Sequence, residues 1–105
     1  MERYCWKAKI KPGKKEEYIF RHQNIWPEMV KLLKEAGIKN YSIWLSGNEV
    51  IGYYECEKGA KFAAKTQANS EIVKKWNVYM EDVLDMEMDA ETGAQPHLEE
   101  VFYLE

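Results

Sequence analysis

The amino-acid sequence predicts an α+β fold, namely a ferredoxin-like βαββαβ sandwich in which an antiparallel sheet carries helices on one face. Three observations predict this fold. Apolar and polar residues alternate over 4–10 and 40–45, apolar residues recur at helical spacing in two other regions, and a turn containing glycine joins two predicted strands. A chain of 105 residues is sufficient for one domain, which we expect to span 1–105.

The N-terminal part of the chain supplies a strand and a divided helix. Alternating side chains predict a strand over 4–10, which Pro12-Gly13 ends. The stretch 14–24 is predicted to be helical, and Pro27 suits the first turn of a further helical segment. The helix is therefore expected to be kinked before Pro27, or broken and restarted there. Gly37 can adopt the left-handed backbone conformation that commonly ends a helix, so we expect the second helical segment to end there.

A predicted hairpin follows. Residues 40–45 alternate like a strand, and the turn at Ser46-Gly47-Asn48 leads into a strand at 50–55. Helices on one face of the sheet leave the other face bare, and Trp44 is expected to point there. A second copy of the sheet would remove this apolar surface from water. The sequence therefore predicts a homodimer.

The C-terminal part is expected to complete the sandwich. A short helix is predicted over 59–66, and Asn69-Ser70 offers a cap for a longer helix. The acidic stretch 85–97 is predicted to be a long loop, and a loop of this length in a compact domain usually indicates function or disorder. The stretch 98–104 is expected to close the sheet as a strand.

Composition and charge exclude several classes of protein. Fifteen basic and eighteen acidic side chains give a net charge of −3, so no nucleic-acid partner is expected. Charged residues interrupt the sequence too often for a membrane span, and the N-terminus has no apolar stretch of signal-peptide length. Cys5 and Cys56 are too few for a disulfide framework. We therefore expect a cytoplasmic protein.

One group of side chains is suited to chemistry. On a helix, Tyr18 and His22 lie within about 40° of each other and about 6 Å apart along the axis. Their shared face meets either the core or a cleft into which Tyr41 could also project. An imidazole with an ordinary pKa of about 6.5, together with two phenols, suits proton transfer between oxygens. The alternative is that His22 is a hydrogen-bonded structural residue.

Other candidate residues have simpler interpretations. Trp76 is predicted either to belong to the core or to form a stacking platform for a ring. His97 is interpreted as a solvated side chain of the acidic loop. The cysteines, histidines and carboxylates show no metal-ligand motif, and no glycine-rich phosphate loop is present. We therefore expect neither a metal nor a cofactor.

Four motifs resemble one protein family. The segment EEYIFRHQNIWPEM at 16–29 resembles a segment of L-rhamnose mutarotases, and NYSIWL, KKWNVYM and EEVFYL are similar to later signatures of that family. These matches occur in the same order over nearly the whole chain. The resemblance implies a dimeric α+β barrel enzyme that interconverts the α and β anomers of L-rhamnose, or of a related 6-deoxy aldose, without metal or cofactor.

The resemblance also implies roles for single residues. His22 matches the family's proton donor, and Tyr18 and Tyr41 match positions that contact the sugar. Trp76 matches the first of two tandem tryptophans, whereas Asn77 stands in place of the second, which bears on substrate preference more than on reaction type. His22 is accordingly expected to protonate the ring oxygen during opening and to take the proton back on closure. Trp76 and Asn77 are expected to contact the sugar.

Two alternatives remain open at this point. The same dimeric α+β barrel could carry a different reaction, such as that of a monooxygenase or another isomerase, because fold alone does not determine function. The protein could instead be a non-catalytic sugar-binding dimer, which would bind a monosaccharide without accelerating anomer exchange. The presence of Tyr18, His22 and Tyr41 favours the mutarotase.

Overall fold

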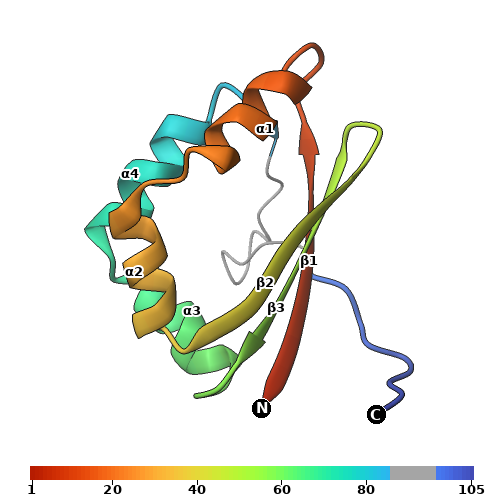
Figure 1. Cartoon of the computed structure of the whole chain (residues 1–105), viewed down its shortest axis with the longest axis vertical. Coiled ribbons are helices and arrows are strands. Elements are labelled where there is room, and N and C mark those ends of the chain that lie inside the picture. The colour runs from red at the N-terminus through yellow and green to blue at the C-terminus, as the bar shows by residue number, and fades with distance from the viewer. Residues whose placement is uncertain (86–96) are drawn as a thin grey trace.

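The computed structural model describes residues 1–85 and 97–105 (Figure 1). The strands in these residues are β1 (Glu2–Ile10), β2 (Ile38–Ser46), β3 (Glu49–Cys56) and β4 (Leu84–Asp85). The helices are α1 (Lys15–Gln23), α2 (Pro27–Glu35), α3 (Ala60–Ala68) and α4 (Glu71–Met80). None of these helices has both the length and the apolar character that a membrane span requires.

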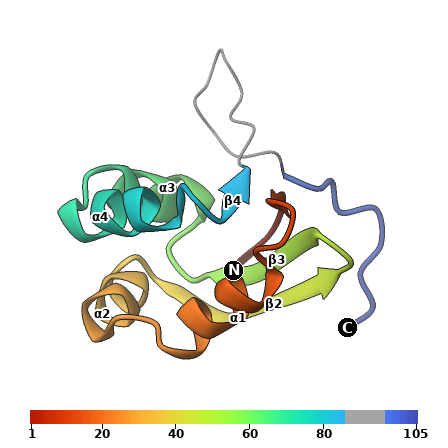
Figure 2. The same cartoon turned by 90° about the horizontal axis from the view of Figure 1, so that it is seen from above.

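The strands form one antiparallel sheet with the order β2-β3-β1-β4. Figures 1 and 2 show that the sheet is curved and that the helices cover only one of its faces. The helix-facing side of β1, β2 and β3 packs against the helices to form the core. Its members are mostly apolar residues that the sequence places at alternating strand positions or at helical spacing. The predicted α+β class is confirmed.

Of the two outcomes expected before Pro27, a kink or a break, the structure has the break. Trp26 has an extended backbone with φ −64° and ψ 136°, and Pro27 opens α2. Proline suits this place because the first helical position has no intrahelical partner for an N–H group. The predicted cap of the longer helix is confirmed as well, since the Ser70 hydroxyl accepts a hydrogen bond from the Val73 N–H. The hairpin of β2 and β3 forms as expected.

The prediction of a strand over 98–104 is wrong. The outer position beside β1 is taken by β4, whose Leu84 and Asp85 pair with Ile10 and Lys9. After an isolated bridge between His97 and Trp6 and a bond from the Leu98 N–H to the Cys5 carbonyl, the C-terminal segment leaves the edge of β1 (Figure 1). A strand needs a continuous ladder of partners, and among the described residues this segment makes no such ladder beyond the bond between Leu98 and Cys5.

The bare face of the sheet is present as predicted. Trp44 points away from the helices and is 67% exposed. The predicted loop at 85–97 is wrong at its two ends, because Asp85 belongs to β4 and His97 forms an isolated bridge with Trp6, and its residues 86–96 lie outside the described residues.

Candidate active site

Helix α1 presents Tyr18 and His22 side by side. Their ring centroids are 4.3 Å apart and the ring planes differ by 31°. Nδ1 of His22 lies 3.2 Å from the backbone carbonyl oxygen of Tyr18, one helical turn earlier. A carbonyl can only accept, so we assign the hydrogen of the neutral imidazole to Nδ1. Nε2 of His22 then carries a lone pair and is free to take up a proton.

The environment of His22 favours this neutral form. Partial burial lowers the pKa of His22 below its ordinary value because it disfavours the charged imidazolium. The hydrogen bond to the Tyr18 carbonyl acts in the opposite direction and is the smaller effect. At neutral pH the ring is therefore a base rather than an acid.

A β-bulge sets the direction of Tyr41 on the opposite wall. The register of β2 against β3 shifts between Lys39 and Ser42, so that two β2 residues, Asn40 and Tyr41, stand where β3 has one. Asn40 adopts a left-handed φ of 51°, and its side-chain amide donates to a Glu55 carboxylate oxygen at 2.6 Å. The extra residue brings Tyr41 onto the helix-facing side of the sheet.

Aromatic rings line this face of the sheet. The indole Nε1 of Trp6 donates a hydrogen bond to the hydroxyl of Tyr41 at 3.2 Å. The Tyr41 ring packs against Tyr54 with a centroid distance of 5.0 Å, and Tyr54 stacks on Tyr4 at 5.1 Å. Sequence reasoning placed Trp6 only in the strand pattern and did not identify Tyr54 as a neighbour of the site.

Both phenols of the site are protonated donors at neutral pH. Burial raises the pKa of Tyr18. Burial also raises the pKa of Tyr41, the nearby phenols of Tyr18 and Tyr4 raise it further, and the bond from Trp6 lowers it. The hydroxyl of Tyr18 is buried and has no hydrogen-bond partner among the described residues. A buried hydroxyl left unpaired costs about 1–3 kcal/mol, so an added hydrogen-bond partner would stabilise this group.

Helix α4 adds Trp76, for which the predicted core role is confirmed, whereas its role as a stacking platform for a ring stays a prediction. It is buried in the core, and its ring also stands edge-on to the His22 ring at 5.4 Å. The Trp26 ring meets it at 5.0 Å. Asn77 is exposed on α4 and does not belong to the buried group around His22. Its predicted contact with a ligand stays a prediction.

His97 lies apart from this group. It is exposed, as predicted, although its ring stacks on Tyr4 at 5.7 Å. Within residues 1–85 and 97–105, no cluster of three or more histidine, cysteine or carboxylate side chains has the arrangement of a metal site.

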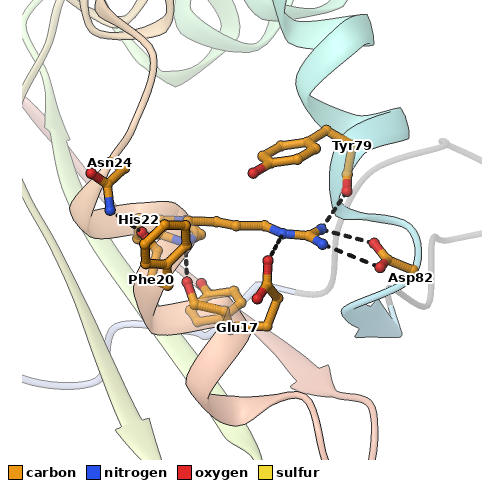
Figure 3. Close-up of polar contacts among 8 residues, drawn as sticks. Glu17, Phe20, His22, Asn24, Tyr79 and Asp82 are labelled. Atoms are coloured by element: carbon orange, nitrogen blue, oxygen red, sulfur yellow. Dashed lines mark hydrogen bonds and ion pairs between the residues drawn. The ribbon is translucent and has the colours of Figure 1, made fainter.

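Arg21 ties α1 to the end of α4 and was not identified from the sequence. Its guanidinium binds Glu17 at 2.8 Å, Asp82 at 2.8 and 3.2 Å, and the Tyr79 carbonyl at 2.6 Å (Figure 3). It also lies 4.4 Å from the centre of the Tyr79 ring. These contacts pair a nearly buried cation with groups from α1, from α4 and from the turn that follows α4. They fix the helix that carries His22 relative to the helix that carries Trp76.

Comparisons with known proteins agree on one family. The sequence profile described as L-rhamnose mutarotase matches residues 3–104. The chain is 37% identical to L-rhamnose mutarotase of Formosa agariphila, with all of both chains aligned. It is 38% identical to L-rhamnose mutarotase of Sinorhizobium fredii, with 99% of each chain aligned.

A solved structure gives the same result. The crystal structure of L-rhamnose mutarotase from Formosa agariphila matches all of this chain with a TM-score of 0.81 and 35% sequence identity. The match covers all of that chain as well.

The contacts of Arg21 predict a stability change. Arg21→Lys keeps the charge but removes the forked donors that hold Glu17, Asp82 and the Tyr79 carbonyl together. We expect the free energy of unfolding, measured by urea denaturation, to fall by about 1–2 kcal/mol. The control Lys74→Gln breaks an exposed ion pair with Glu71 and should change it by less than about 0.5 kcal/mol. Equal effects of the two variants would contradict the assigned role of Arg21.

Proposed function

The chain belongs to the L-rhamnose mutarotase family, and we propose that it interconverts the α and β anomers of L-rhamnose through acid–base opening and closure of the sugar ring. The observation that carries this proposal is the free Nε2 of His22 beside the unpartnered hydroxyl of Tyr18. This exchange needs a group that takes a proton from one oxygen and returns it to another, and a neighbouring hydroxyl that can hold the sugar by a hydrogen bond.

His22 is proposed to act first as a base. Nε2 takes the proton of the O1 hydroxyl, the O1–H electron pair forms the C1=O1 double bond, and the C1–O5 pair moves to O5. Since O1 and O5 are bonded to the same carbon, the resulting imidazolium delivers the same proton to O5. The donation to the ring oxygen that the sequence predicted is then the second half of the step. Rotation about C1–C2 and the reverse sequence produce the other anomer, without a bond to the enzyme.

The phenols are proposed to bind the sugar. Tyr18 and Tyr41 stay protonated because burial raises the pKa of each, so they donate hydrogen bonds to sugar oxygens and do not act as bases. Trp76 provides an apolar ring edge next to His22, against which a carbon-rich face of the sugar can pack. Asn77 is proposed, from the family resemblance alone, to influence which aldose is preferred. No metal or cofactor enters this mechanism.

We also propose that the active form is a cytoplasmic homodimer. The strand order β2-β3-β1-β4 supports a ferredoxin-like sandwich, and its bare face carries the exposed Trp44. The C-terminal segment beside that face exposes Val101, Phe102 and Leu104. A second copy would cover these apolar side chains, and two sheets facing each other would form the dimeric α+β barrel.

Loss of the imidazole should stop anomer exchange. His22→Ala is expected to remain folded but to lower the rate of exchange between the L-rhamnose anomers by about 10²–10⁴-fold, the usual contribution of general acid–base catalysis. Exchange NMR with catalytic amounts of protein measures this rate. His97→Ala serves as the matched control and should keep the wild-type rate. A folded His22→Ala protein with wild-type exchange would overturn the proposal.

The lowered pKa of His22 predicts two effects of pH. kcat/KM should fall only below about pH 6.5, as the imidazole becomes protonated and ceases to be a base. Folding stability should also decrease as the pH falls from about 6.5 toward the folded-state pKa, since the unfolded chain binds that proton more readily. Both dependences should disappear in His22→Gln. Activity that increases on acidification would contradict the role of His22 as a base.

The proposed dimer predicts the mass in solution. Sedimentation equilibrium should give about twice the chain mass of 12.4 kDa. Phe102→Asp should shift the protein toward the monomer, because it places a charge among the apolar side chains of the C-terminal segment. Val78→Asp, at an exposed position of α4, is the control that should leave the dimer intact. A wild-type protein with the mass of one chain would refute the dimer.

A further inference from the structure

Trp6 occupies an unusual place on the sheet. It pairs with Gly52 in the register of β1 and β3, and Gly52 in turn pairs with Ile43 of β2. A Cβ atom at Gly52 would collide with three atoms of the Trp6 indole. The indole therefore lies directly over the backbone of β3, which only glycine permits. By crossing over β3, the indole of Trp6 on β1 brings its Nε1 within hydrogen-bond distance of the Tyr41 hydroxyl on β2.

The donor and the acceptor of this hydrogen bond are fixed by the chemistry of the two groups. An indole N–H can only donate, so the hydroxyl of Tyr41 must accept it at 3.2 Å. The hydrogen of that hydroxyl is then left for a different acceptor. Accepting one hydrogen bond also strengthens a hydroxyl as a donor. Trp6 itself is buried, so bulk water does not compete for its N–H.

We propose that Trp6 is a positioning residue of the active site, whose indole N–H holds the Tyr41 hydroxyl as a hydrogen-bond donor toward the sugar. This inference rests on the proposed function, because it requires a sugar oxygen as the acceptor. Three features support it together: the bulge that turns Tyr41 inward, the glycine beneath the indole, and the bond between the two rings. Trp6 acts through Tyr41 and touches no reacting atom.

A double-mutant cycle tests this inference. Trp6→Phe keeps an aromatic side chain in the core but removes the N–H donor together with part of the indole ring, whereas Tyr41→Phe removes the hydroxyl. We expect Trp6→Phe to raise KM for L-rhamnose by about 3- to 10-fold with little change in kcat, because a binding contact is weakened. In the Tyr41→Phe background the same substitution should have no further effect. An effect of equal size in both backgrounds, or no effect in either, would overturn the inference.

A matched control separates this effect from the general cost of removing an indole. Trp44 donates to the Ser42 hydroxyl at 3.0 Å on the bare face of the same sheet. Trp44→Phe should leave KM unchanged, and equal increases in KM for Trp44→Phe and Trp6→Phe would overturn the inference. The indole N–H signal of Trp6 should also move in the NMR spectrum of Tyr41→Phe, and an unmoved signal would show that the two rings are not bonded.

The outcome for the proposed function can be read separately. If the wild-type protein exchanges the anomers but the cycle is additive, the inference fails and the mutarotase activity stands. If the wild-type protein binds L-rhamnose in calorimetry without exchanging the anomers, the mutarotase proposal fails. In that case the dissociation constants for L-rhamnose of the wild type, the two single variants and the double variant still support or overturn the role of Trp6.

Discussion

The hydrogen bond between His22 Nδ1 and the Tyr18 carbonyl determines the chemistry available to this site. It spans one turn of α1, so the backbone of the helix itself fixes the tautomer. Because Nδ1 holds the hydrogen and burial keeps the ring neutral, Nε2 has to receive a proton before it can give one. The contacts of Arg21 with α4 hold this helix in place, so the orientation of the imidazole depends on packing as well as on the local turn.

The sheet contributes a second constraint, which is the direction of Tyr41. Side chains of a regular strand alternate between its two faces, and Ile38 faces the helices. Without the bulge, Tyr41, three residues later, would therefore point to the bare face. The left-handed conformation of Asn40 makes the change of phase possible. Gly52 then leaves room for the Trp6 indole to reach the phenol. Helix and sheet therefore each supply a group whose hydrogen-bonding role is set before any ligand binds.

Much of this arrangement is predictable from the sequence, but some of it depends on contacts between distant residues. Periodicity predicts the order of strands and helices and brings Tyr18 near His22, because both features are local. The four hydrogen bonds of the Arg21 guanidinium include two to Asp82, which is 61 positions away in the sequence. No pattern in the residues near Arg21 therefore predicts them. The prediction of a strand over 98–104 was wrong because apolar residues near the C-terminus do not show whether another strand is available to pair with them. Gly52 inside a predicted strand was the available signal for a close approach, and it indicates Trp6 only once the register is known.

The proposed mechanism depends on the tautomer and charge of His22, and nitrogen NMR measures both directly. In protein labelled with ¹⁵N at histidine, the correlation spectrum of the ring nitrogens at pH 7 should show a protonated Nδ1 and an unprotonated Nε2 for His22. The signal is assigned by its loss in His22→Gln. An imidazolium at this pH, or a neutral ring with its hydrogen on Nε2, would contradict a mechanism in which His22 begins as the base.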